Sequence, residues 1–179
     1  MFLYISNFNF VSRFCGIIYY FTMDSNTGAT KKNILLNILW NFGVIKSKRR
    51  LNTVVFLIQC KLKERDNNPL DYKFYDTITG PYSEELMDDI ESLANAGFIN
   101  GSNKTNEGLF THHYILTDFG KTAFEWTIKK SMPLEIQDAI RDNSQKYKEL
   151  SWYDTLNDSK AEGCAKFLSK DTLSIFEEI

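Results

Sequence analysis

The sequence predicts an α+β fold with a three-helix core, a two- or three-stranded sheet and additional C-terminal helices. Apolar residues recur at helical spacing in three successive segments, each preceded by a capping residue. Two strand-like segments on either side of a polar stretch follow them, and further amphipathic segments complete the chain. The length of 179 residues, with 43% hydrophobic and 25% charged residues, suits one globular domain with an extension.

The first two helices are expected near the start of this globular part. Thr30 can cap a helix over residues 31–42, and Gly43 supplies its C-terminal stop. Ser47 can cap the second helix, which we expect over about 48–63. The second helix is rich in β-branched residues, which disfavour an isolated helix, so burial in a core must hold it.

The third helix has the clearest signals in the chain. Residues 71–79 are expected to be extended, and the pair Gly80-Pro81 ends that segment. Ser83 then caps a helix with acidic residues in its first turn, as the helix dipole favours, and Gly97 ends it. Its expected core face consists of Leu86, Ile90, Leu93 and Ala94.

A hairpin and several helices follow. Phe98-Ile99 begins a strand, residues 100–109 are expected to form a polar loop, and residues 110–116 return as a second strand. Three helices followed by such a hairpin make the order of a winged helix-turn-helix, with the hairpin as the wing. Thr117 should cap a fourth helix, and Pro133 should begin a fifth. Inward positions expected in these two helices are Phe119, Ala123, Trp126, Ile128, Leu134, Ile136, Ala139 and Ile140.

The predicted organisation has three parts. Residues 1–29 form an N-terminal segment, 30–130 the winged-helix domain and 131–179 a helical extension, with short helices around 150–156 and in the tail. Aromatic residues crowd the first 22 positions, and we interpret the segment as disordered or as lying before a true start at Met23. A membrane-surface anchor or a pairing strand is the alternative for this segment.

Four stretches of sequence resemble the YwgA-type winged-helix proteins of archaea and bacteria. They are Arg50 to Ile58, Gly80 to Leu86, Leu93 to Ile99 and Tyr114 to Gly120. More distantly, the chain is similar to SocA-like Panacea-domain proteins. The resemblance covers about residues 30–128 and implies transcriptional regulators or interaction modules without an assigned reaction.

The sequence gives no positive support for an enzyme, and we expect no cofactor and no metal. His112 and His113 are adjacent on a strand and point to opposite faces, so they do not share a metal. The three cysteines form no CxxC pair, and Cys60 lies in an apolar stretch that favours burial. Phosphate-binding glycine motifs are missing from the sequence.

A transcriptional regulator that binds double-stranded DNA is the leading functional hypothesis. It depends on the winged-helix order and on six cations, which would contact phosphates: Lys46, Lys48, Arg49, Arg50, Lys31 and Lys32. Basic residues at the start of the second helix oppose its dipole, which an anion there would relieve. The alternative is a solvated cluster balanced by the acidic third helix.

The third helix argues for a second hypothesis. In a winged helix it would read the major groove, yet it contains no Lys or Arg. Its carboxylates would repel phosphates. The second hypothesis is therefore a protein-interaction module, antitoxin-like or regulatory, whose acidic face binds a partner. The candidate residues of this face are Glu84, Glu85, Asp88, Asp89 and Glu91.

Composition adds the remaining expectations. The net charge of -2 gives no global basic field for nucleic acid. Reduced cysteines favour the cytoplasm, and no stretch of the sequence is long and apolar enough to span a bilayer, so no membrane partner is expected. Exposed aromatics near residue 152 and the tail leave a homodimer open.

Overall fold

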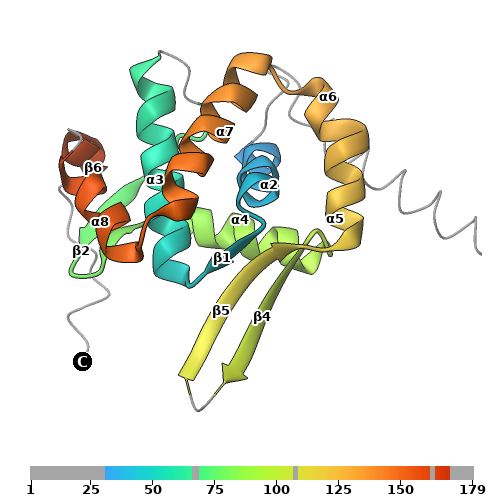
Figure 1. Cartoon of the computed structure of the whole chain (residues 1–179), viewed down its shortest axis with the longest axis horizontal. Helices are drawn as coiled ribbons and strands as arrows, with labels where there is room; N and C mark the ends of the chain where they lie inside the picture. The colour runs from blue at the N-terminus through green and yellow to red at the C-terminus, as the bar shows by residue number, and fades with distance from the viewer. Residues whose placement is uncertain (1–30, 66–68, 107–108, 162–163, 170–179) are drawn as a thin grey trace, which may run out of the picture.

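The computed structural model is an α+β fold that combines a group of helices with two small sheets at its edges (Figure 1). It describes residues 31–65, 69–106, 109–161 and 164–169. The expected start at Met23, the Thr30 cap and the end of the tail beyond residue 169 lie outside the described residues.

Helix α2 (Lys31–Phe42) lies at the centre of the molecule (Figure 1). Helices α7 (Leu134–Glu149) and α4 (Glu84–Asn95) contact it, as does strand β5 (Leu109–Leu116). Burial therefore extends beyond the expected apolar stripe to polar positions, and Asn33 and Asn37 are also buried. A helix covered on several sides cannot present a simple two-faced pattern.

Helix α3 (Lys48–Glu64) confirms the predicted cap and the predicted burial. The hydroxyl of Ser47 accepts a hydrogen bond from the backbone N–H of Arg50 at 3.2 Å. Every residue from Leu51 to Cys60 is buried. The tertiary packing expected to hold this β-branched helix is thus present.

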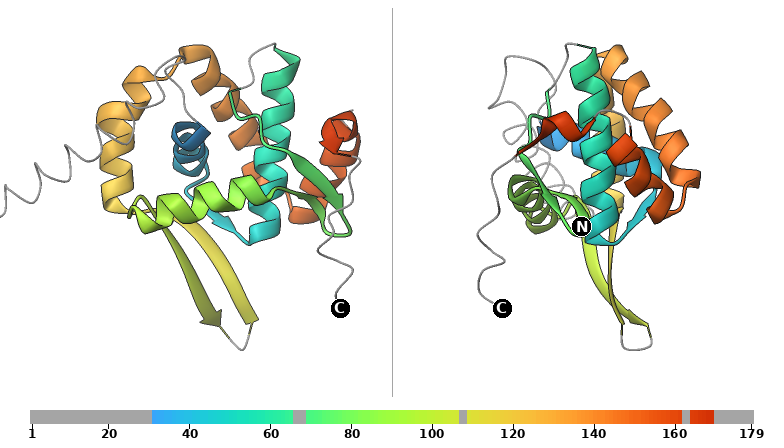
Figure 2. Two further views of the ribbon diagram at one scale, coloured as in Figure 1. Left: turned by 180° about the vertical axis from the view of Figure 1, so that it is seen from behind. Right: turned by 90° about the vertical axis from the view of Figure 1, so that its left-hand side faces the viewer.

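The first sheet is antiparallel and contains the hairpin. Its order is β1-β5-β4, with β1 at Val44–Lys46 and β4 at Ile99–Asn106. The hairpin extends away from the helices (Figures 1 and 2). The polar loop expected over 100–109 is wrong, because β4 pairs with β5 as far as Asn106 opposite Leu109. Continuous backbone hydrogen bonding stabilises an extended chain here despite its turn-rich composition.

The second sheet joins distant parts of the chain. Strand β2 (Phe74–Thr77) pairs with β3 (Gly80–Tyr82) and, in parallel, with β6 (Leu168–Ser169). The tail was expected to be helical, but its described part is a 3₁₀ turn, η2 (Cys164–Phe167), followed by β6. The exposed edge of β2 accounts for this difference, since it offers backbone partners to the tail.

The fourth helix contains a π turn that changes its buried face. Its parts are α5 (Asp118–Ala123), η1 (Phe124–Ile128) and α6 (Lys129–Ser131). Thr117 caps it as predicted, accepting from the N–H of Gly120 at 3.0 Å. The inward position expected for Trp126 is wrong, because its side chain is 64% exposed. The wider π turn shifts the register, so Phe124 is buried in place of Trp126, whereas the predicted burial of Ala123 and Ile128 is confirmed.

Helix α7 packs against α2 and α3 through a predicted set of residues. Ile136, Ala139 and Ile140 are buried, as expected. The inward position expected for Leu134 is wrong, since its side chain is 74% exposed. Positions two apart on a helix point to nearly opposite sides, so Leu134 faces away when Ile136 faces the core. Helix α8 (Trp152–Ala161) follows and packs against α3.

Candidate functional site

The acidic helix α4 is held in place by a polar contact from α3. The hydroxyl of Ser83 accepts from the N–H of Leu86 at 3.3 Å, which confirms the predicted cap. The N–H of Ser83 itself donates to the side-chain oxygen of Asn52 at 2.9 Å. Of the predicted core face, Leu86, Ile90 and Leu93 are buried, whereas Ala94 is partly buried and lies at the edge of the core. The rest of α4 is thereby left for charged side chains.

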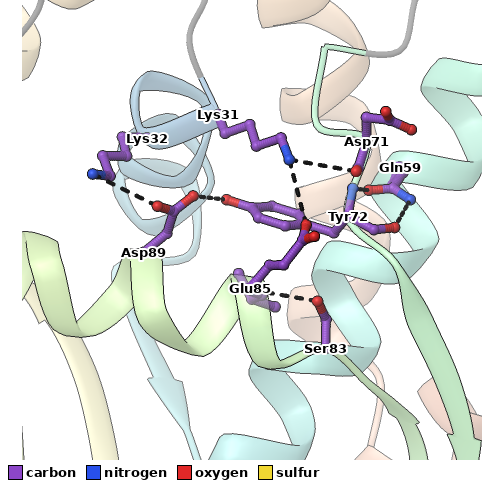
Figure 3. A network of polar contacts seen from close by, with 9 residues as sticks. Lys31, Lys32, Gln59, Asp71, Tyr72, Ser83, Glu85 and Asp89 are labelled. Carbon is purple, nitrogen blue, oxygen red and sulfur yellow. Dashed lines mark hydrogen bonds and ion pairs between the residues drawn. The ribbon is translucent and has the colours of Figure 1, made fainter.

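One side of α4 faces α2, where two candidate phosphate-binding lysines lie against two candidate partner-binding carboxylates (Figure 3). The ammonium of Lys31 is 3.5 Å from the Glu85 carboxylate, and that of Lys32 is 3.6 Å from the Asp89 carboxylate. The two sets of residues therefore neutralise each other at this side. These partly exposed pairs are each worth little in stability.

Tyr72 completes this network and was not singled out by the sequence. Its hydroxyl donates to the Asp89 carboxylate at 2.7 Å, and the ammonium of Lys31 lies 4.8 Å from its ring centroid (Figure 3). Both backbone groups of Tyr72 bond to the buried Gln59 amide, each at 2.8 Å. Burial, together with the bond to Asp89, raises the pKa of the Tyr72 phenol far above its usual value.

Arg50, a third candidate for phosphate contact, is directed at backbone groups. Its guanidinium donates to the carbonyl oxygens of Tyr147 at 2.9 Å and Leu150 at 2.8 Å. These carbonyls end α7, where a cation is favoured by the helix dipole. Arg50 therefore caps α7 and joins it to α3.

The remaining candidate cations lie together near the hairpin. Lys46 ends β1, and Lys48 and Arg49 begin α3; all three side chains are exposed. No carboxylate within the described residues forms an ion pair with them. The ammonium of Lys48 is 5.2 Å from the ring centroid of Tyr82.

A groove of about 700 Å³ separates the other side of α4 from the base of the hairpin. The residues that line this groove belong to α3, β3, α4, β4 and β5. Its lining residues are Lys48, Tyr82, Glu84, Met87, Asp88, Ile90, Glu91, Ala94, Gly101, His112 and Tyr114.

Three of the predicted acidic residues project from α4 at this groove. Glu84, Asp88 and Glu91 follow the i, i+4, i+7 spacing that places side chains on one helix face. All three are exposed, and none forms an ion pair within the described part of the chain. A neighbouring hollow of about 520 Å³ continues along α4 and shares Asp88 and Glu91. The five acidic residues thus divide into two groups. Glu85 and Asp89 form ion pairs with lysines of α2, and the other three form a row without an ion pair to a described residue.

The groove also brings together aromatic residues that the sequence could not associate. His112 and Tyr114 alternate on β5, and their rings stack with centroids 6.4 Å apart. Tyr82 comes from β3. Neither the hairpin register nor the distance of β3 from β5 can be read from sequence spacing, and only the side-chain period of two hinted that residues 112 and 114 share a face.

Cys60 and Cys164 meet in the core although 104 positions separate them. Both are buried, and neither is in a disulfide. The hydrogen bond to Cys164 and burial raise the pKa of the Cys60 thiol, which keeps it in the less reactive protonated form. The burial predicted for Cys60 is confirmed.

Among the described residues, no group of three or more His, Cys, Asp and Glu side chains is arranged to hold a metal ion. None of the helices in that part of the chain combines the length and apolar character needed to cross a bilayer.

Comparison with known proteins confirms part of the expected relationship. The chain is 31% identical over 86 residues to the uncharacterized protein YwgA of Bacillus subtilis (strain 168). The aligned part makes up 48% of this chain and 49% of YwgA, so the chain spans about half the length of that relative. No protein-family model and no solved structure matches the chain.

Proposed function

We propose that residues 31–131 form a winged helix-turn-helix in which α4 is the third helix and the β4–β5 hairpin is the wing. The support is the order α2, β1, α3, α4, β4, β5 and the sheet order β1-β5-β4. The β2–β3 hairpin is an insertion between α3 and α4, so the two helices are not joined by a tight turn.

We propose further that this winged helix is a protein-interaction module, and that its groove binds a positively charged segment of a protein partner. The observation that carries the proposal is the row of Glu84, Asp88 and Glu91 along an open groove, in which none of the three carboxylates forms an ion pair with a described residue. Complementary charge gives such contacts specificity and fast association.

The same row opposes insertion of α4 into DNA. Helix α4 carries five carboxylates and no Lys or Arg. Of the six candidate phosphate-binding cations, Lys31 and Lys32 lie against α4 carboxylates and Arg50 caps α7. Phosphates beside this helix would meet uncompensated repulsion.

The test measures binding of a labelled arginine- and lysine-containing peptide and of labelled duplex DNA, each at low ionic strength. We expect the peptide to bind and the DNA not to bind. A groove variant removes the row without changing its shape: Glu84→Gln, Asp88→Asn and Glu91→Gln. We expect peptide affinity to fall by about tenfold or more, a loss typical of removing charge-assisted contacts.

A control variant makes the same change in net charge elsewhere. It carries Glu125→Gln, Glu135→Gln and Glu149→Gln, which are exposed and outside the groove. Peptide affinity should change little in this variant. Equal losses of peptide affinity in both variants would mean that binding depends only on the net charge of the protein. The proposed site would then be wrong.

One observation favours DNA as a second candidate partner. Lys46, Lys48 and Arg49 are exposed at the junction of β1 and α3 and have no acidic partner among the described residues. DNA binding that weakens steeply with salt, and is lost in Lys46→Ala with Arg49→Ala, would establish this mode. Retained DNA binding in the groove variant would then show that α4 is not the contacting element.

A further inference from the structure

We infer that the groove recognises arginine in particular, with the guanidinium placed between the α4 carboxylates and the tyrosine side chains of β3 and β5. The inference rests on the proposed protein-binding function and names the side chain that the partner supplies. It depends on Tyr114, on Lys48 and Tyr82, and on the row Glu84, Asp88 and Glu91.

Tyr114 supplies the first observation, independent of the carboxylates. Its side chain is only 5% exposed, yet it lines the groove. Its hydroxyl makes no hydrogen bond to any described residue. A hydroxyl at the wall of the groove without a described partner is available to hydrogen-bond to a ligand there. Burial raises the pKa of the Tyr114 phenol, so at neutral pH the hydroxyl both donates and accepts.

Tyr82 supplies the second observation. Its ring already faces a cation, because the Lys48 ammonium lies 5.2 Å from its centroid. The chain thereby demonstrates that this wall of the groove accommodates positive charge. Lys48 is exposed and reaches the groove from α3, so an incoming cation would displace it into solvent.

The combination of groups fits arginine better than lysine. A guanidinium is planar, stacks on aromatic rings and has five N–H donors that can reach a carboxylate and a hydroxyl together. A lysine ammonium satisfies charge alone and is more strongly hydrated. Carboxylates spaced one helical turn apart beside two tyrosines offer both kinds of contact at once.

The experiment compares short glycine-based peptides of equal length that contain either arginine or lysine at the same positions. Binding to the full chain is measured by calorimetry at low ionic strength. We expect the arginine peptide to bind about tenfold more tightly than the lysine peptide, as a bidentate contact with stacking allows. Equal affinities would overturn the arginine inference and leave the protein-binding proposal standing, whereas no binding of either peptide would overturn both.

Two single variants locate the contact. Tyr114→Phe keeps the ring and removes the hydroxyl, so it should reduce arginine-peptide affinity by about fivefold to tenfold and leave lysine-peptide affinity nearly unchanged. Lys48→Ala removes the internal competitor and should raise arginine-peptide affinity. An unchanged arginine preference in Tyr114→Phe, with weaker binding in Lys48→Ala, would contradict the assigned site. Circular dichroism of each variant verifies that it is folded.

Discussion

Arg50 connects the start of α3 to the end of α7 by hydrogen bonds to three carbonyl oxygens, at 2.8 to 3.4 Å. All three bonds come from one terminal nitrogen of the guanidinium, whose two N–H groups lie among the carbonyls that end α7. The neighbouring Arg49 is exposed and makes no such bond to any described residue. Two adjacent arginines of the same basic cluster therefore have different roles.

We predict that Arg50→Ala lowers the free energy of unfolding by about 2 kcal/mol, the range for hydrogen bonds to charged groups. Arg49→Ala should change it by less than about 0.5 kcal/mol, as exposed substitutions usually do. Urea unfolding followed by circular dichroism measures both. Similar small effects in the two variants would show that the hydrogen bonds of Arg50 make no net contribution to the free energy of unfolding.

Titration of the Tyr72 phenol should change the free energy of unfolding measurably. Its phenol is buried, donates to Asp89 and is surrounded by Lys31, Lys32 and Glu85. Folding raises its pKa above the unfolded value. The stabilisation is therefore fully present below the unfolded pKa of about 10 and is lost as the pH rises above it.

We predict that the chain is more stable than its Tyr72→Phe variant at neutral pH and that this difference shrinks in alkali. Above about pH 10 the difference should fall by about 1.4 kcal/mol per pH unit, the slope for one proton. Unfolding in urea between neutral and alkaline pH measures it. The variant keeps every neighbouring lysine and carboxylate, so the contribution of their titration cancels in the difference between the two proteins. A stability difference that does not depend on pH would contradict the raised pKa of Tyr72.

At the scale of elements, the close approach of α5 to the chain before β4 is specific to glycine. A Cβ placed on Gly120 would lie 2.0 Å from the carbonyl oxygen of Phe98. The same carbonyl accepts hydrogen bonds from the N–H of Thr117 at 3.0 Å and from its hydroxyl at 3.2 Å. The backbone here has little freedom to move aside.

We predict that Gly120→Ala lowers the free energy of unfolding by about 3 kcal/mol, at the upper end for overpacking, because the obstacle is backbone. Gly101→Ala is the control, since a Cβ there meets nothing within 4 Å. Thermal unfolding of both variants tests the difference. A soluble Gly120→Ala protein that unfolds at the same temperature as the control would mean that α5 and the chain before β4 can move apart at little cost.

The elements also show what a sequence can predict and why. The caps at Ser47, Ser83 and Thr117 were predictable because each bond spans only three residues. The extension of β4 to Asn106 was not, since it depends on pairing with β5. The π turn was hidden as well, because the alternation of apolar residues near Trp126 fits an α-helix equally well.

The same distinction applies to the candidate site. The sequence identified the acidic row on α4, because three carboxylates at helical spacing are a local property. It could not divide that helix into a side neutralised by Lys31 and Lys32 and a side open to the groove. Tyr114 and Tyr82 join the groove through tertiary packing, for which the sequence contains no local signal.

At the scale of the whole molecule, the C-terminal part shares one core with the rest of the described chain. Helix α7 contributes Ile136, Ala139, Ile140 and Tyr147 to the cluster that includes α2 and α3. Tyr147 is among the largest fully buried side chains. Without α7, the central helix α2 would expose apolar surface on one side. Exposing apolar surface to water lowers the free energy of unfolding by about 25 cal/mol per Å².

We therefore predict that a chain ending at Ser131 does not fold cooperatively, although it contains every element of the proposed winged helix. Scanning calorimetry should show one transition for the full chain and none for the shortened chain, because the apolar faces of α2 and α3 lose their cover. The full chain with Tyr147→Ala should still unfold cooperatively, at a lower temperature, since it leaves a cavity but keeps the helix. A shortened chain that melts within a few degrees of the full chain would instead make α7 an accessory, and the groove beside α4 would then belong to an independent winged-helix domain.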